Sequence, residues 1–313
     1  GGRFSRQPLA GNLIPAARLD AMARKMIEFY PLPNAAGTAD GRQNYSDPQP
    51  RRIDYHSHTA RLDQAFGSSH RLYGSLTWSY LLEAWNNAFH NLARGLARNR
   101  QHRGVALDDV LTVRPDLVLN LRYGLTRFIL YDRPLSMGFD LASLGFPAAL
   151  VNQLDRSTTT FPEIVPSGYA SLGAASGSRP ITTYHTVSGS AMHLRGNHSL
   201  RAGGEWRILQ ENSYDYGYVS PRIEFAMAWT RGPMDNSPTA PIGQCLASLL
   251  MGLPTGGYID RNASYAQQSG FLGFYLQDDW KATPTLTVSA GLRWELETPV
   301  TERFNRTTPV SYT

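Results

Sequence analysis

The chain has 313 residues, enough for a sizeable core, and 30 lysine and arginine residues against 25 acidic residues give it a formal net charge of +5. The basic residues are scattered rather than clustered, which argues against nucleic acid as a partner. No unbroken run of 18 apolar residues occurs, so helical membrane spans are excluded, and the single Cys245 excludes a disulfide scaffold. Low charge (18%), many aromatic residues (11%) and 28 glycines favour an all-β fold.

The first fifty residues are not strand-like. Apolar residues recur at helical spacing over residues 15–30, which predicts a short amphipathic helix. Pro31 and Pro33 end it, because proline cannot continue a helix. A loop rich in Gly, Asn, Asp and Pro then runs to about residue 50.

Beyond residue 50 the spacing of the apolar residues changes from the helical period to every second residue. In residues 117–130, for example, Leu119 and Leu121 alternate with Asn120 and Arg122. Alternate side chains of a strand point to opposite faces, so each such segment has one apolar and one polar face. The predicted strands are residues 52–66, 70–82, 100–112, 117–130, 181–194, 198–213, 265–281 and 285–298.

The connections between these strands are alternately short and long. Tight turns with Gly, Pro, Asn and Ser follow the first, third, fifth and seventh strands, whereas the long connections span residues 83–100, 131–180 and 214–263. Short turns at one end and long loops at the other are typical of outer-membrane barrels. In the third long loop, residues 222–229 predict an extra strand and residues 242–253 a short apolar helix.

We therefore predict an all-β fold, the antiparallel wall of a transmembrane β-barrel with about eight spanning strands and long outer loops that carry short helices. Residues 1–50 would form an outer loop segment with a short helix, residues 51–298 a partial β-barrel, and residues 299–313 the start of the next loop. A soluble β-sandwich also has alternating strands, but soluble strands average about 5–6 residues. Aromatic residues near the strand ends, such as Trp78 and Trp280, also favour the membrane.

Residues 273–281 (GFYLQDDWK), 282–288 (ATPTLTV) and 291–295 (GLRWE) resemble a signature of TonB-dependent outer-membrane receptors. The similarity is to the Oar-like subfamily, which carries an N-terminal carboxypeptidase-regulatory-like domain. Further matching pieces occur in the same order, at residues 11–15 with 29–34, 61–63 with 70–74, and 249–254. The resemblance implies a barrel of about 22 strands, a plug domain inside it, and a segment that contacts a TonB-type energising protein.

The chain shows no plug or TonB-contacting segment, and too few strands for such a barrel. It begins at Gly1 without a signal segment, so we expect an internal piece of a longer protein. A mature secreted protein is the alternative.

Charged side chains on the polar strand faces are the candidate lumen-facing residues, in contact with plug and water. They are Asp63, Arg122, Arg201, Glu205, Arg207, Arg293 and Glu295. Most of them are expected to form solvated ion pairs. Candidates for substrate contact are aromatic residues assigned to the outer loops: Tyr169, Tyr184, Tyr216, Tyr218 and Tyr258.

Catalytic and metal signals are weak. His56 and His58 share one strand face, but zinc needs three or four ligands. Asp278 and Asp279 could form an acid–base pair, although no third partner is visible. Cys245 fits a buried apolar helix better than a nucleophile. We expect no catalysis and no cofactor.

The predicted function is part of a TonB-dependent receptor of the bacterial outer membrane, which takes up a scarce solute with energy from the inner membrane. Its expected partners are outer-membrane lipid, the parent chain's plug, the energising protein and an unidentified solute. Two alternatives stay open. One is a secreted soluble β-protein that binds or cleaves glycans, and the other is a complete barrel of about eight strands with a structural or adhesive role.

Overall fold

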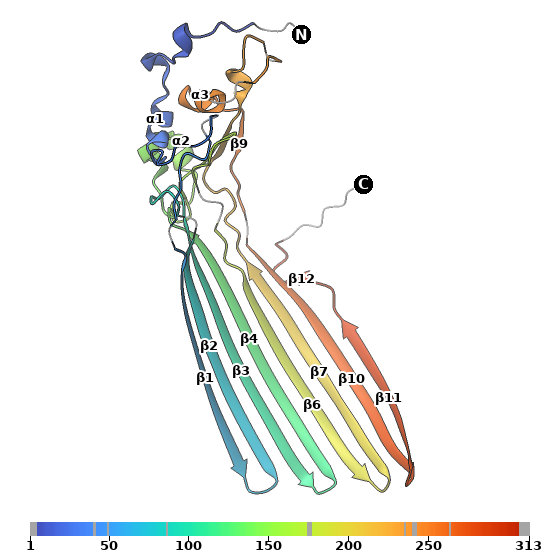
Figure 1. Cartoon of the computed structure of the whole chain (residues 1–313). Coiled ribbons are helices and arrows are strands. Elements are labelled where there is room, and N and C mark those ends of the chain that lie inside the picture. Colours follow the sequence, from blue (N-terminus) through green and yellow to red (C-terminus); the bar gives the residue numbers. More distant parts are fainter. Residues whose placement is uncertain are drawn as a thin grey trace.

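A sheet of eight long antiparallel strands dominates the structure (Figure 1). The computed structural model describes residues 5–39, 42–48, 50–85, 87–173, 177–234, 236–239, 243–262 and 264–306. Sequential strands are neighbours throughout, in the order β1-β2-β3-β4-β6-β7-β10-β11, and a short β12 adds to β10. The strands are β1 (Arg52–Phe66), β2 (His70–Trp85), β3 (Leu96–Arg114), β4 (Leu117–Pro134), β6 (Ile181–Arg195), β7 (His198–Ser213), β10 (Tyr265–Thr283), β11 (Leu286–Glu297) and β12 (Thr301–Glu302).

All eight predicted spanning strands are confirmed, and all four short turns lie at the same end of the sheet (Figure 1). Gly67 and Gly196 supply the positive φ that two of these turns require. The largest differences from the prediction are at the opposite end, where β3 begins four residues earlier and β4 ends four residues later than expected. There the backbone ladder continues to the pair Leu96 and Pro134, although the side-chain alternation has faded.

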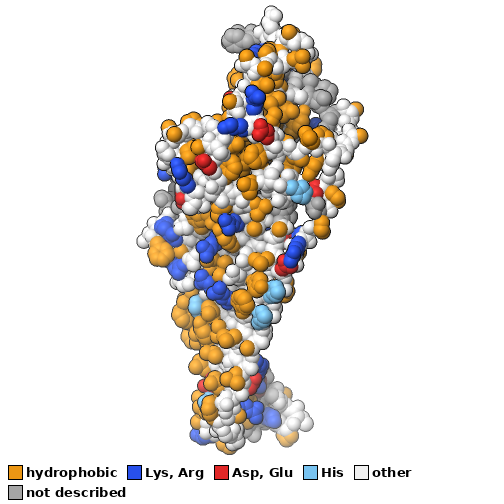
Figure 2. All heavy atoms as spheres, turned by 90° about the vertical axis from the view of Figure 1, so that its left-hand side faces the viewer, with side chains coloured by type: hydrophobic (Ala, Val, Ile, Leu, Met, Phe, Trp, Pro, Cys, Tyr) orange, Lys and Arg blue, Asp and Glu red, His pale blue; other side chains and the backbone are white. Residues whose placement is uncertain are grey.

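The register gives the sheet two chemically different faces. Residues directly opposite one another share a face, and one transverse row joins Leu62, Gly74, Leu107, Tyr123, Val187, Trp206, Leu272 and Leu296. The adjacent row on the other face joins Asp63, Tyr73, Asp108, Arg122, Ser188, Glu205, Gly273 and Glu295. Figure 2 shows hydrophobic side chains gathered over the lower part of the strands.

The sheet is open. β1 and β11 are its two edges, and within the described residues they do not pair with each other. The alternative of a complete barrel of about eight strands requires this pairing, which the described residues do not show. Residues 299–306, expected to start a loop, fold back so that β12 pairs with Gln267 and Gln268 of β10; residues 307–313 lie outside the described residues.

The long connections are folded rather than loose. We call the described residues of segments 5–48, 87–95, 135–180 and 214–262 the outer cap, which lies above the strands (Figure 1). A cluster of buried apolar side chains from all four segments forms its core: Ala23, Met26, Ala93, Leu141, Leu144, Phe146, Val151, Phe161, Ile164, Leu172, Phe225 and Leu249. Its elements are η1 (Ala10–Asn12), η2 (Ala16–Arg18), α1 (Ala21–Ile27), η3 (Leu141–Leu144), α2 (Ala148–Val151), β5 (Glu163–Pro166), β8 (Arg222–Phe225), η4 (Met227–Trp229), α3 (Gln244–Leu250) and β9 (Gly256–Tyr258).

Both predicted helices and the extra strand are present but shorter than expected. Asp20 caps α1 by accepting a hydrogen bond from the Ala23 amide at 2.8 Å, so the α-helix starts at residue 21 instead of 15. The Asp20 amide donates to the Leu250 carbonyl at 2.8 Å and joins α1 to α3. Among the described residues, no helix is both long and apolar enough to cross a membrane.

Candidate functional site

The seven predicted lumen-facing residues share the polar face of the sheet. Asp63, Arg122, Glu205 and Glu295 lie in one transverse row. Arg207 lies in the next row toward the cap, and Arg293 and Arg201 lie in the next two rows toward the turns. Because the opposite face carries the apolar side chains suited to lipid, this charged face would line the lumen of a barrel.

Most of these charges are already paired, as expected. Arg61 donates to Asp63 at 2.7 Å, Arg293 donates to Glu295 at 2.5 Å, and Arg207 contacts Glu205. Each of these pairs joins residues two apart on one strand. Arg122 reaches across to Asp108 of β3, which also accepts a hydrogen bond from the Asn120 amide at 2.9 Å. The exposed pairs Arg61–Asp63 and Arg293–Glu295 contribute roughly 0–1 kcal/mol each, so they make the face polar and wettable more than they stabilise it.

A shallow groove of about 170 Å³ crosses the middle of the charged face. Its polar walls include Arg122, Glu205 and Arg293. Gly189, Gly204 and Gly273 form part of its lining. The groove is suited to water or to a polar surface packed against the wall.

The five candidate tyrosines do not form one site. Tyr184 is not in a loop: it lies on β6, on the polar face, opposite Thr126 and Leu209. Tyr216 is buried, its ring packs edge-on against Tyr214, and burial together with Tyr131 raises the pKa of its phenol to about 12. Both of these assignments as outer contact residues are therefore corrected.

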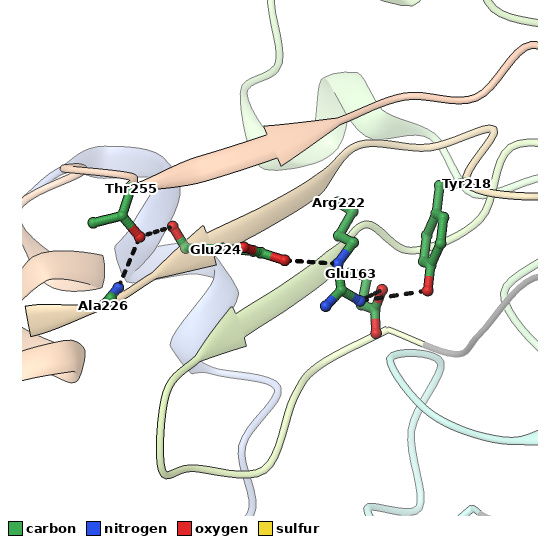
Figure 3. A network of polar contacts seen from close by, with 6 residues as sticks. All are labelled: Glu163, Tyr218, Arg222, Glu224, Ala226 and Thr255. Carbon is green, nitrogen blue, oxygen red and sulfur yellow. Dashed lines mark hydrogen bonds and ion pairs between the residues drawn. The ribbon is translucent and has the colours of Figure 1, made fainter. Parts of the chain in front are cut away.

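Tyr218 takes part in a structural network with Arg222, Glu163 and Glu224 (Figure 3), and Tyr258 packs against its ring. Their rings meet edge-on with centroids 5.1 Å apart, and Arg222 of β8 lies against both. Arg222 pairs with Glu163 of β5 and donates to Glu224 at 3.1 Å. The Glu163 carboxylate raises the pKa of the Arg222 guanidinium, which stays charged. This network fixes the three-stranded sheet β5-β8-β9.

Tyr169 lines a cavity of about 870 Å³ in the outer cap, the outer cavity. Its hydroxyl accepts a hydrogen bond from the Gly243 amide at 2.9 Å. The walls come from separate stretches of chain and include Tyr30, Tyr45, Phe89, Tyr169 and Gln244. Its size is within the range of roughly 300–1,000 Å³ typical of small-molecule sites.

The aromatic walls of the outer cavity are held in place. Phe89 packs against Tyr30 and Tyr45, with centroids 5.8 and 6.1 Å apart. The Tyr30 hydroxyl donates to the Ala170 carbonyl at 2.5 Å and the Tyr45 hydroxyl to the Ala88 carbonyl at 2.9 Å. Burial raises the pKa of Tyr30, so its phenol stays neutral. With both hydroxyls engaged, these residues can offer ring surface to a ligand.

Polar groups complete the outer cavity. Asp47, Asn44 and Gln43 lie along one part of its lining, and Asp47 is hydrogen-bonded to His90 at 3.1 Å. Rigid aromatic surface beside amide and carboxylate groups can bind a solute that is partly apolar and partly polar. The sequence did not identify Tyr30, Tyr45 or Phe89, because they come from separate segments without strand or helix periodicity.

The remaining sequence candidates for chemistry are Asp278, Asp279, His56, His58 and Cys245. Asp278 and Asp279 point to opposite faces, Asp278 toward His198 at 2.6 Å and Asp279 toward Gln277 at 3.2 Å, so the proposed acid–base pair is wrong. His56 and His58 stack on Tyr80 and Trp78. Within the described ranges, no group of three or more potential ligands could hold a metal ion. Cys245 is buried, which raises the pKa of its thiol.

The fold defines the class of protein, an outer-membrane barrel of which this sheet is a wall. Its marks are the long tilted strands, the division into an apolar and a charged face, and the short turns at one end. The chain belongs to the family of outer membrane beta barrel domains, whose family model matches residues 1–312. It is a protein of the bacterial outer membrane, and the alternative of a secreted soluble β-protein is therefore wrong.

Among solved structures, the chain is similar to the crystal structure of the outer membrane transporter YddB from Escherichia coli, at 9% identity and a TM-score of 0.48. The match covers 81% of this chain and 29% of that one, so the chain spans less than a third of its length. Comparison with curated proteins returned no significant match.

Proposed function

We propose that the chain is part of a TonB-dependent receptor of the Oar-like subfamily, which takes up a scarce solute across the outer membrane with energy from the inner membrane. The observation that carries this proposal is the outer cavity, about 870 Å³ with rigid aromatic walls, in a folded cap at the end of the sheet remote from the short turns. In outer-membrane barrels the long loops are extracellular. A solute would therefore meet this cavity first.

The charged face supports the second half of the proposal. Paired charges at Asp63, Arg122, Glu205 and Glu295 give a wet, polar inner wall, suited to a plug domain of the parent chain. The plug would release the solute inward when a TonB-type protein binds it and supplies energy from the inner membrane. The chain itself would carry no catalysis and no cofactor; its partners would be lipid, plug, energising protein and solute.

Uptake assays on cells that express the parent protein in their outer membrane test this proposal. Uptake of labelled ferric siderophores, maltodextrins and oligopeptides is measured with and without a protonophore, and in cells that lack the TonB-type protein. We expect one solute class to enter only in energised cells with the complete system. Uptake that continues in the presence of the protonophore and in cells without the TonB-type protein would show a passive pore and overturn the proposal.

The same assay tests the outer cavity. Phe89→Ala removes the ring that joins Tyr30 and Tyr45, and should weaken solute binding by about tenfold or more, as for buried aromatic contacts in other binding sites. Phe304→Ala, at an exposed position that does not line the cavity, is the matched control and should bind normally. Equal binding by both variants would place the solute elsewhere.

A further inference from the structure

Two arginines lie side by side on the apolar face of the sheet. Arg103 of β3 and Arg127 of β4 are directly opposite in the register. Their row also contains His58, Trp78, Thr183, Gln210 and Gln268, and the next row toward the turns consists mainly of Ala60, Leu76, Val105, Leu125 and Ile208. The arginines therefore stand at the cap-side boundary of the apolar surface.

Neither guanidinium is neutralised. Arg103 donates to the Gln101 side chain at 3.2 Å, and Arg127 donates to the Thr183 hydroxyl at 3.2 Å. Both acceptors are uncharged, and among the described residues neither arginine has a carboxylate partner. Like charges directly opposite on neighbouring strands repel each other, so the pair is destabilising unless an anion lies between or above the two groups.

The depth of the pair matches the boundary of a membrane. Arg127 lies ten residues from Leu117, the first residue of β4 after the turn. Ten residues rise about 33 Å along a strand, and a tilt near 40° reduces this to about 25 Å, the height of the apolar band of an outer-membrane barrel. Trp78 in the same row and Tyr80 in the next, with ring centroids 5.2 Å apart, are typical of the aromatic girdle at that boundary.

The charge and the position together select the ligand. Guanidinium groups recognise phosphate through paired, charge-assisted hydrogen bonds. An acyl chain attached to that phosphate would lie over Leu125, Val105 and Leu76, whereas a free phosphate would gain nothing from them. We propose that Arg103 and Arg127 form a binding site for the phosphorylated headgroup of a lipid in the outer leaflet. This site is independent of solute uptake.

Native mass spectrometry of the detergent-solubilised parent protein tests the proposal. The probes are bisphosphorylated lipid A, the same lipid without its phosphates, and inorganic phosphate as a competitor. The variant is Arg103→Gln with Arg127→Gln. The matched control is Arg71→Gln with Arg100→Gln, two arginines of β2 and β3 on the polar face. Slower migration of each variant on a gel after heating verifies that it is folded.

We expect the phosphorylated lipid to bind the parent and the control, and the double variant to bind it at least about tenfold more weakly, the scale of one or two charge-assisted hydrogen bonds. The comparison of the phosphorylated with the dephosphorylated lipid is made on the unchanged parent protein, which keeps the test valid if the glutamine variant does not fold. Three outcomes overturn the proposal: full binding by the glutamine variant, equal binding of the dephosphorylated lipid, or displacement by equimolar inorganic phosphate.

Discussion

Gly203 and Gly204 of β7 each lie beneath an aromatic ring of β10. A Cβ atom at Gly203 would stand 2.7 Å from the Gly189 carbonyl oxygen and 2.7 Å from Cε1 of Tyr275. A Cβ atom at Gly204 would stand 2.7 Å from Cδ1 of Phe274, on the other face. The two glycines therefore let one ring cover the lumen side and another the lipid side of the same strand, which compensates for the missing side chains.

Substitution at Gly203 should consequently destabilise the barrel wall. We expect Gly203→Ala to lower the free energy of unfolding of the parent protein by about 1–3 kcal/mol, because the new methyl group meets backbone as well as a ring. Gly124→Ala on the same face is the control: its Cβ would meet only Thr186, at 3.9 Å. Alanine there should be neutral or stabilising by about 0.4–1 kcal/mol. Urea unfolding in detergent micelles measures the free energy of unfolding of both variants. Equal changes in the two variants would contradict the close contact inferred at Gly203.

Tyr216 gives the outer cap a sensitivity to alkali. Burial, and then the Tyr131 hydroxyl, raise the pKa of Tyr216 to about 12, whereas a phenol in an unfolded chain ionises near 10. The folded state keeps its proton longer, so this contribution to stability is fully present below about pH 10 and is lost as the pH rises through about 12. Ultraviolet titration of tyrosinate should show a late-ionising group in the parent protein that Tyr216→Phe lacks. An unchanged titration curve in that variant would contradict the assignment.

At the scale of elements, the strands could be predicted and the cap could not. Each spanning strand carries its own period of two, so residues such as Leu119 and Arg122 reveal their faces without knowledge of any partner. The core of the cap is assembled from four segments: Met26, Ala93, Ile164 and Leu249 have no common period in the sequence. The same reason concealed the walls of the outer cavity and the buried position of Tyr216, whereas the predicted strand 181–194 already contains Tyr184 and excludes a loop position for it.

Arg222 is the residue on which the small sheet of the cap depends. We expect Arg222→Gln to lose the ion pair with Glu163, to leave that half-buried carboxylate without its partner, and to speed amide hydrogen exchange in β5 by about tenfold or more. Arg261→Gln, at an exposed position of the same loop, should leave the exchange unchanged. Equal protection of Ile164 and Val165 in both variants would show that β5 is held by its backbone alone.

At the scale of the whole molecule, the open sheet determines whether the chain can fold by itself. On each edge strand, β1 and β11, about half of the backbone N–H and C=O groups point away from the sheet without a partner. In hydrocarbon an unsatisfied group costs several kcal/mol, so the edges cannot face lipid. Further strands of a larger barrel, or pairing between chains, would satisfy them.

Residues 1–313 expressed alone should therefore aggregate or remain unfolded in detergent, as judged by size-exclusion chromatography and circular dichroism. Closure of β1 onto β11 is the competing outcome, and cysteines at Leu62 and Leu292, both on the apolar face, detect it with a bifunctional thiol reagent. We expect no cross-link within one chain. A monodisperse, heat-modifiable, β-rich species with that cross-link would show that the eight strands can close by themselves. The chain would then not need the further strands of a larger barrel, and the argument for a receptor would lose this support.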